Sequence, residues 1–247
     1  MSVVIIGAGH AGVAAATALR KLDKDINITL ISEEKNLPYH RPPLSKKTVY
    51  SEKPSCDLLL SEDYYIKNNI KLTRNSPIED IDPENNCINL ASKELIHYEQ
   101  LIIATGVERC KLKMNGGELA KTLYSMEDAY SLSKSISTAK RITVIGGGFI
   151  GCEIASGSRK LGKEVTLLEA GPSILGRSVA PIFAQKVAKY HKSQGINILT
   201  NWVWRIVLHV YRVTQYFTLS IIICDGNKIG STSARSCSNH GIAPQTI

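Results

Sequence analysis

Two short glycine runs are the residues of this chain whose spacing most directly indicates chemistry. The first lies at residues 7–12 and reads GAGHAG, directly after the β-branched run Val3–Ile6. An alanine-rich segment, Ala11–Lys21, follows and predicts a helix. Glycines at this strand-to-helix turn permit a tight turn at Gly7, a close approach of pyrophosphate at Gly9 and close helix packing at Gly12. The helix N-terminus adds oriented N–H donors for an anion, so the run predicts a dinucleotide site.

An acidic residue supports this first site. Glu33 follows a predicted strand at Ile28–Ile31, 21 residues after Gly12. A carboxylate at this point can accept hydrogen bonds from both ribose hydroxyls of an adenosine, although a solvated glutamate is the alternative. The predicted contacts of the first loop are Gly7, Gly9, His10, Ala11, Gly12 and Glu33.

The second run reads GGGFIG and occupies residues 146–151, between a predicted strand and a predicted helix. Glu169 follows 18 residues after Gly151. An acid at the ribose position favours NADH, because its charge repels the 2′-phosphate of NADPH, while the nearby Arg177 would offset part of that repulsion. The predicted contacts of this second loop are Gly146, Gly148, Phe149, Ile150, Gly151, Glu153, Glu169 and Arg177.

The elements around both runs repeat the order strand, helix, strand. Around the second run they are Ile142–Ile145, Phe149–Leu161 and Val165–Leu168. Two such units predict an α/β chain with two Rossmann-like domains, each built on a mostly parallel sheet. We expect a first nucleotide-binding domain over residues 1–109, a second over 110–229 and an irregular tail over 230–247.

The connecting segments predict β structure. Residues 77–95 have the pattern of a β-meander that returns to the first sheet through a buried strand at Leu101–Ile103. Residues 202–223 are apolar and about as long as a membrane span, but Arg205 and Arg212 interrupt them. Each central arginine costs about 2.5–3.5 kcal/mol on an insertion scale, which argues against a membrane helix. Antiparallel strands that end in an Asp225-Gly226 turn fit better.

Charge is unevenly distributed along the chain. Residues 1–110 carry 13 Lys and Arg against 15 Asp and Glu, whereas residues 111–247 carry 17 against 7. The basic second half could attract phosphates or an acidic protein. No nucleic-acid-binding motif is present, so we expect no nucleic-acid partner. The six cysteines lie far apart, without the spacing of a zinc site or a redox dithiol, which predicts reduced thiols, no metal and a cytoplasmic chain.

A proline-rich segment after the first unit carries two cations. It reads LPYHRPPLSK over residues 37–46. It resembles the flavin loop of the ferredoxin reductases of oxygenase systems, which are relatives of rubredoxin reductase and apoptosis-inducing factor in the FAD-dependent pyridine nucleotide-disulfide oxidoreductase superfamily. By that resemblance, Arg41 faces the FAD pyrophosphate and Lys46 lies beside the isoalloxazine. From the residues alone, a rigid surface turn with two solvated charges is the alternative.

The same resemblance assigns further residues. Glu153 would face the nicotinamide and pair with Lys46, while a first-turn glutamate that complements the helix dipole is a compatible alternative. The strand end at 102–106 resembles the segment with which the family leaves its FAD domain, and the meander meets the adenine near Ile78. The additional cofactor contacts implied in this way are Ile78, Ala104, Thr105 and Gly106.

The resemblance implies an FAD-dependent oxidoreductase that passes a hydride from NADH, or less readily NADPH, to FAD and then electrons to a small redox protein such as a ferredoxin. Two departures matter. Tyr124 stands where the family often has an arginine, and the family's later FAD-domain segment with its flavin-binding aspartate is not found. We therefore expect the first domain to be incomplete and FAD to be held weakly. The alternative is a truncated module that binds a nucleotide or a partner without turnover.

Overall fold

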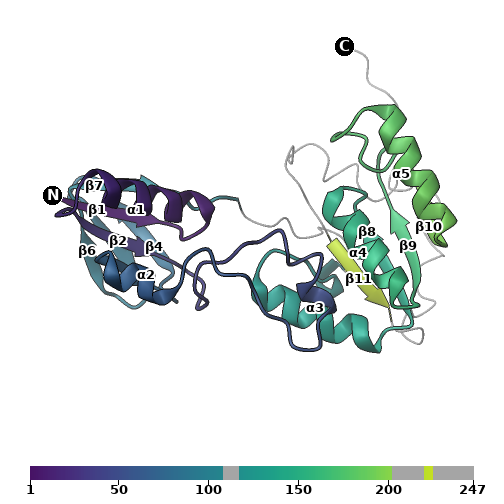
Figure 1. Cartoon of the computed structure of the whole chain (residues 1–247), viewed down its shortest axis with the longest axis horizontal. Helices are drawn as coiled ribbons and strands as arrows, with labels where there is room; N and C mark the ends of the chain where they lie inside the picture. Colours follow the sequence, from purple (N-terminus) through teal and green to yellow (C-terminus); the bar gives the residue numbers. More distant parts are fainter. Residues whose placement is uncertain (108–116, 202–219, 225–247) are drawn as a thin grey trace, which may run out of the picture.

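The structure is a computed structural model that describes residues 1–107, 117–201 and 220–224. These residues form two lobes, each built around a four-stranded sheet (Figure 1). The predicted boundary near residue 110 and the predicted tail at 230–247 lie outside the described residues, as does the predicted turn at Asp225-Gly226. Two Rossmann-like lobes confirm the predicted α/β class.

The first lobe contains a parallel sheet with the strand order β3-β2-β1-β7. Its elements are β1 (Ser2–Ile6), α1 (His10–Leu22), β2 (Asn27–Ile31), α2 (Glu62–Lys67), β3 (Ile70–Thr73) and β7 (Gln100–Ile103). Strand β1 is almost entirely buried, as expected for a central strand that is covered on both faces. The strand, helix and strand predicted around the first glycine run are therefore confirmed, each to within one residue.

The predicted meander is also present. It consists of β4 (Ile78–Asp82), β5 (Cys87–Leu90) and β6 (Leu95–His97), paired antiparallel in that order. Ile88 and Leu90 of the meander pack with Val4, Ile6 and Ile31 of the parallel sheet, so the small sheet covers one face of the large one. The chain then returns through β7, which pairs parallel with β1 as predicted.

The second lobe repeats the arrangement with one difference. Its elements are η2 (Gly117–Leu119), α3 (Met126–Thr138), β8 (Arg141–Ile145), α4 (Phe149–Lys160), β9 (Glu164–Leu168), α5 (Pro181–Ser193), β10 (Ile196–Leu199) and β11 (Ser220–Cys224). The sheet order is β10-β9-β8-β11, with β11 antiparallel to β8. The position that β7 fills as a parallel strand in the first lobe is thus filled by a strand of opposite direction in the second.

An arginine near the end of the loop helix repeats between the lobes. Arg20, eight residues after Gly12, donates hydrogen bonds to the carbonyl oxygens of Lys24 and Asn68, among others, at the end of α1. Arg159, eight residues after Gly151, donates to the equivalent carbonyls of Lys163 and Gln194 at the end of α4. Each guanidinium ties the C-terminus of the loop helix to the backbone that enters the third strand. The two lobes therefore share local chemistry as well as topology.

A segment of the first half of the chain packs into the second lobe. Residues 37–50, which we call the proline loop, include a short 3-10 turn, η1 (Thr48–Tyr50). The dark blue trace that crosses between the lobes in Figure 1 carries this turn to the side of α3. Tyr39, Leu44 and Val49 are buried in one hydrophobic cluster with residues of α3, α4 and the second sheet. The proline loop therefore belongs to the core of the second lobe.

Candidate nucleotide and flavin sites

The first glycine loop has the geometry of a dinucleotide-binding turn. Gly7 adopts φ +100°, and a Cβ there would collide with the carbonyl of Ala104. A Cβ on Gly12 would collide with the carbonyl of Gly7, so helix α1 can approach the turn only because residue 12 is glycine. Gly9 has no atom within 4 Å of an added Cβ and therefore opens to the outside of the loop. The open side is where a ligand could approach the backbone.

The second glycine loop matches the first. Gly146 adopts φ +105° and Gly148 is open in the same way as Gly9. Both helices begin without a side-chain hydrogen bond at their N-cap glycines, so their first N–H groups have no side-chain acceptor there. Such N–H groups at a helix N-terminus suit an anionic group.

Glu169 lies against the second loop. Its carboxylate accepts hydrogen bonds from the backbone N–H groups of Gly147 (2.7 Å) and Gly171 (2.8 Å). An added Cβ on Gly147 would lie 2.7 Å from Ile174 and 2.9 Å from the Glu169 carboxylate, so a larger residue here would have to displace these side chains. Arg177 is exposed and makes no ion pair with Glu169 among the described contacts. The role of Arg177 in nucleotide choice stays a prediction.

Glu33 is placed differently from Glu169. In the first lobe Gly7 N donates to Ile31 O, and in the second Gly146 N donates to Leu168 O, so the two strand ends correspond. The residue after Leu168 is Glu169, but the residue after Ile31 is Ser32, and Glu33 comes one position later. Glu33 is exposed and forms no hydrogen bond within the described part of the chain. Its predicted contact with a ribose stays a prediction. Strand β2 ends at Ile31, as the sequence predicted, so Glu33 lies one position further from its strand end than Glu169 does.

An ion pair joins the proline loop to the helix of the second glycine loop. Lys46 Nζ lies 3.1 Å from Oε1 of Glu153, which is in the first turns of α4. Ser45 donates a hydrogen bond to the other carboxylate oxygen of Glu153. The Lys46 side chain is 55% exposed and that of Glu153 is 30% exposed, so the pair borders solvent. The predicted pairing of Lys46 with Glu153 is thus present.

Tyr50 provides a second link to the same helix. Its hydroxyl donates to the carbonyl of Ile154 at 2.8 Å, and burial raises the pKa of Tyr50 to about 12. A Cβ on Gly157 would collide with the Tyr50 ring. Because Glu153 and Gly157 are one helical turn apart, the proline loop contacts one face of α4 at two successive turns.

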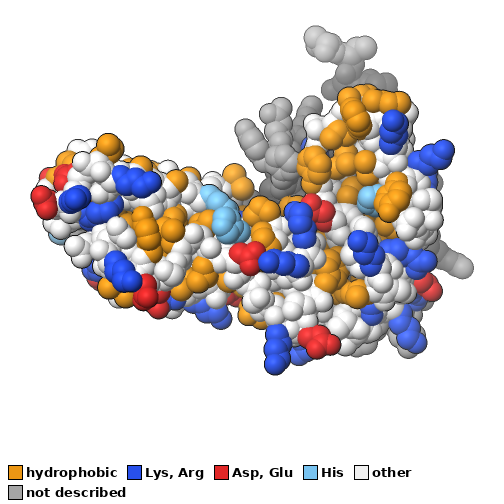
Figure 2. All heavy atoms as spheres, viewed as in Figure 1, with side chains coloured by type: hydrophobic (Ala, Val, Ile, Leu, Met, Phe, Trp, Pro, Cys, Tyr) orange, Lys and Arg blue, Asp and Glu red, His pale blue; other side chains and the backbone are white. Residues whose placement is uncertain are grey.

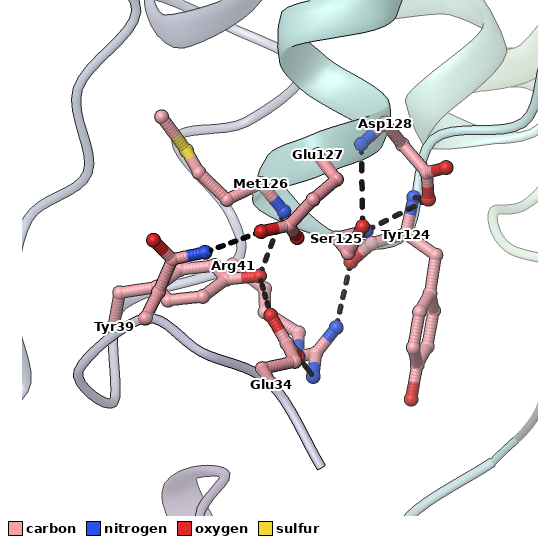
Figure 3. A network of polar contacts seen from close by, with 9 residues as sticks. Glu34, Tyr39, Arg41, Tyr124, Ser125, Met126, Glu127 and Asp128 are labelled. Carbon is pink, nitrogen blue, oxygen red and sulfur yellow. Dashed lines mark hydrogen bonds and ion pairs between the residues drawn. The ribbon is translucent and has the colours of Figure 1, made fainter. Parts of the chain in front are cut away.

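Arg41 lies in a network of polar contacts rather than free in solvent (Figure 3). Its guanidinium donates to Glu34 Oε1 and to the carbonyl of Tyr124, both at 2.6 Å, and lies 4.3 Å from the centroid of the Tyr124 ring. Tyr39 donates to the other oxygen of Glu34 and accepts a hydrogen bond from Met126 N. Burial and the neighbouring Glu34 raise the pKa of Tyr39.

Tyr124 therefore has a role that the sequence did not indicate. Its ring and its carbonyl hold Arg41 in position, although the sequence suggested only that a phosphate contact was missing there. Helix α3 begins two residues later with a capping box between Ser125 and Asp128 (Figure 3). This cap fixes the backbone that carries the Tyr124 carbonyl.

Other predicted contacts lie around the two loops. Ala104, Thr105 and Gly106 follow β7 at the turn that faces Gly7, and Gly106 has φ +74°. The remaining predicted residues are found as follows: His10 at the start of α1 with its ring nitrogen 3.1 Å from that of His40, Ala11 exposed on α1, Ile78 half-buried at the start of β4, and Phe149 and Ile150 exposed at the start of α4.

The described cysteines Cys56, Cys87 and Cys152 are free thiols. Burial raises the pKa of Cys152 to about 12, so this residue is a neutral thiol near pH 7. Within residues 1–107, 117–201 and 220–224, no cluster of three metal-ligating side chains is found. No helix among these residues is long and apolar enough to cross a membrane.

Two glycine loops at strand-to-helix turns, with an ion pair between the proline loop and the helix of the second glycine loop, define a protein of the two-dinucleotide class. Residues 1–209 match the model of the family described as pyridine nucleotide-disulphide oxidoreductase. The chain belongs to this family.

The chain is similar to Rubredoxin-NAD(+) reductase of Pseudomonas putida, with 38% identity over 204 residues, which cover 81% of this chain and 53% of that protein. It is 34% identical over 195 residues to the 3-phenylpropionate/cinnamic acid dioxygenase ferredoxin--NAD(+) reductase component of Photorhabdus laumondii, covering 78% of this chain and 50% of that protein. Among solved structures, the ferredoxin reductase for the CYP199A2 system of Rhodopseudomonas palustris is 33% identical with a TM-score of 0.77, covering 81% of this chain and 50% of that one. The chain spans about half the length of these relatives.

Proposed function

We propose that this chain binds FAD at the first glycine loop and NAD(H) at the second, and brings a hydride donor and a flavin together across the proline loop. The observation that carries the proposal is the 3.1 Å ion pair between Lys46 and Glu153, which links the loop next to the first site to the helix of the second. Bound FAD would supply the chemistry that accepts a hydride and releases single electrons.

The residues of the chain bind and orient the two cofactors. The open sides of Gly9 and Gly148, together with the first N–H groups of α1 and α4, fit two pyrophosphates. Arg41 is held by Glu34 and Tyr124, and the residue before it, His40, contacts His10 at the first glycine loop, so Arg41 would supply a fixed cation for an anionic cofactor there. Lys46 and Glu153 would lie where the two cofactors meet, and they would orient the reacting rings.

Glu169 supports NADH as the preferred donor. Both of its oxygens are already fixed by backbone N–H groups, and each retains a lone pair for a ribose hydroxyl. A 2′-phosphate would bring negative charge against this carboxylate, so NADPH would bind less well.

A small iron–sulfur protein is the electron acceptor that fits best. The relatives are named as reductases of rubredoxin and of dioxygenase ferredoxins, and one similar solved structure, 30% identical with a TM-score of 0.73, is a putidaredoxin reductase–putidaredoxin complex. The visible face of the lobe with α4 and α5 carries many Lys and Arg side chains and few acidic ones (Figure 2). Such a surface would attract an acidic redox partner.

The test is reconstitution with FAD followed by anaerobic addition of NADH, with bleaching of the flavin absorbance as the measurement. We expect bleaching in the parent chain and a rate at least about tenfold lower in Lys46→Met and Glu153→Gln, the size expected when a well-placed group at the reacting atoms is lost. Lys47→Met is the matched control, because Lys47 pairs with Asp57 at 2.8 Å outside the site.

The same experiment distinguishes the proposed reductase from the second candidate function, nucleotide binding without turnover. A chain that binds both nucleotides but never bleaches the flavin would be a nucleotide-binding module without turnover. Equal slowing in Lys46→Met and Lys47→Met would contradict a specific role for the ion pair.

A further inference from the structure

The Glu153 carboxylate is held at both of its oxygens, by Lys46 and by Ser45. Lys46 Nζ contacts Oε1, while Ser45 Oγ donates a hydrogen bond to Oε2. Hydrogen bonds to a carboxylate are stronger than those between neutral groups. Glu153 therefore has two anchors of different kinds, a long flexible ammonium and a short hydroxyl.

Ser45 is the more rigid of the two anchors. It is 5% exposed, whereas more than half of the Lys46 side chain is exposed. The backbone around it forms a tight turn, in which the N–H groups of Lys46, Lys47 and Thr48 all point to the carbonyl of Pro43. The flanking side chains of Leu44 and Val49 are buried in the core of the second lobe.

The hydroxyl of Ser45 consequently has a fixed position relative to α4. Its side chain has a single χ angle, so the position of its oxygen follows directly from the backbone. The second contact of the loop, between Tyr50 and the Gly157 turn of α4, keeps this backbone against the helix. A lysine with four χ angles cannot define the position of its partner in this way.

We propose that Ser45 is a positioning residue, which fixes the rotamer of Glu153 so that Oε1 is presented to Lys46. The inference rests on the proposed function, because it assigns Ser45 to the site where flavin and nicotinamide would meet. Without the Ser45 hydroxyl, the carboxylate rotates away from Lys46 and the ammonium spends more time unpaired.

The test measures the state of Lys46 directly, in the chain as it stands. The rate at which Lys46 reacts with an N-hydroxysuccinimide ester is followed by peptide mass spectrometry, with Lys47 in the same segment as an internal reference. We expect Ser45→Ala to raise the Lys46 rate by about two- to tenfold, the factor that corresponds to one hydrogen bond of ordinary net strength. Ser133→Ala is the matched control, because Ser133 of α3 also donates a hydrogen bond to this part of the chain, at the Ser51 carbonyl (3.1 Å), but lies outside the site.

A double variant shows whether Ser45 acts through Glu153. Glu153→Gln should raise the Lys46 rate by itself, and adding Ser45→Ala should then change nothing further, because coupled residues are not additive. An unchanged rate in Ser45→Ala, an equal rise in Ser133→Ala, or a full additional rise in the double variant would each overturn the proposal.

Flavin-loaded protein gives an independent readout. Ser45→Ala should slow NADH-dependent bleaching while the affinity for NADH stays the same, since Ser45 does not contact the second glycine loop. If the parent chain itself fails to bleach, the proposed function is overturned, and the labelling rates still decide the role of Ser45.

Discussion

Tyr124 contacts Arg41 at a position where an arginine would instead offer a positive charge to the cofactor. An arginine at this position would add a second cation to the site, but Tyr124 instead places its ring 4.3 Å from the guanidinium of Arg41. The carbonyl of the same residue accepts a hydrogen bond from Arg41. Arg41 is thus held firmly, and Glu34 balances its charge.

Loss of the Tyr124 ring should be measurable as a loss of stability. Tyr124→Leu removes the stacking on Arg41 but keeps the carbonyl hydrogen bond, so we expect the free energy of unfolding to fall by about 1 kcal/mol. Tyr124→Phe keeps the ring and should unfold at nearly the parent urea concentration. Equal losses in both variants would assign the effect to the tyrosine hydroxyl and contradict a role for the ring.

At the scale of single residues, the sequence could predict those that belong to a recognisable pattern. The glycines of both loops, Lys46 and Glu153 follow from motif spacing and family resemblance. Ser45, Tyr50 and Gly157 could not be found in this way, because their contacts depend on how the proline loop lies along α4. The Glu34–Arg41 pair was missed for a similar reason, since it forms only when the loop turns back on itself.

Among the elements, α4 carries a glycine that helix propensity does not explain. Gly157 lies in the interior of the helix, where alanine would ordinarily be more stable by about 1 kcal/mol. In this structure a Cβ at residue 157 would collide with the ring of Tyr50. The glycine is therefore the condition for close contact between the proline loop and the helix.

The effect of Gly157→Ala on the free energy of unfolding should change sign when Tyr50 is removed. Gly157→Ala in the parent chain should lower the free energy of unfolding, because Tyr50 is displaced and its hydrogen bond to Ile154 is lost. In a Tyr50→Ala background the same substitution should stabilise the chain by about 1 kcal/mol, the gain in helix propensity. Urea unfolding of the four proteins measures both values, and a stabilising effect in both backgrounds would contradict the packing argument.

The sequence predicted the elements around the glycine runs better than the others. Strands rich in Val and Ile on either side of a glycine turn gave β1, α1, β8 and α4 almost to the residue. Helices α3 and α5 were not predicted, although Ser125 with Asp128 and the proline at the start of α5 are typical N-terminal signals. The sequence predicted antiparallel strands over 202–223, and β11, in the described part of that segment, is antiparallel to β8. That β8 is its partner could not be predicted, because pairing between distant strands leaves no local pattern.

For the whole molecule, the proline loop makes the two lobes interdependent. A division of the sequence near residue 110 assigns residues 37–50 to the first nucleotide-binding domain. Their apolar side chains, however, complete the core of the second lobe. Stability of the second lobe therefore depends on residues 37–50, although the lobe itself begins only at Gly117.

Hydrogen exchange should reveal this dependence. Leu44→Ala removes a buried side chain and should cost about 2–5 kcal/mol. We expect faster amide exchange in α3 and α4, with little change in β1 and β2 of the first lobe. Ile28→Ala, in the separate core of the first lobe, is the matched control. It should speed amide exchange in β1 and β2 and leave exchange in α3 and α4 almost unchanged. Faster exchange confined to the first lobe in Leu44→Ala would contradict the assignment of the loop.

The position of the proline loop also determines the order in which the chain can fold during synthesis. The first sheet can close once β7 has left the ribosome, because all four of its strands lie within residues 2–103. The side chains that the proline loop buries in the second lobe stay exposed to solvent until α3, α4 and the second sheet have been synthesised; these are Tyr39, Leu44 and Val49. For that interval the nascent chain carries an apolar segment without a partner, which is the kind of surface that chaperones bind.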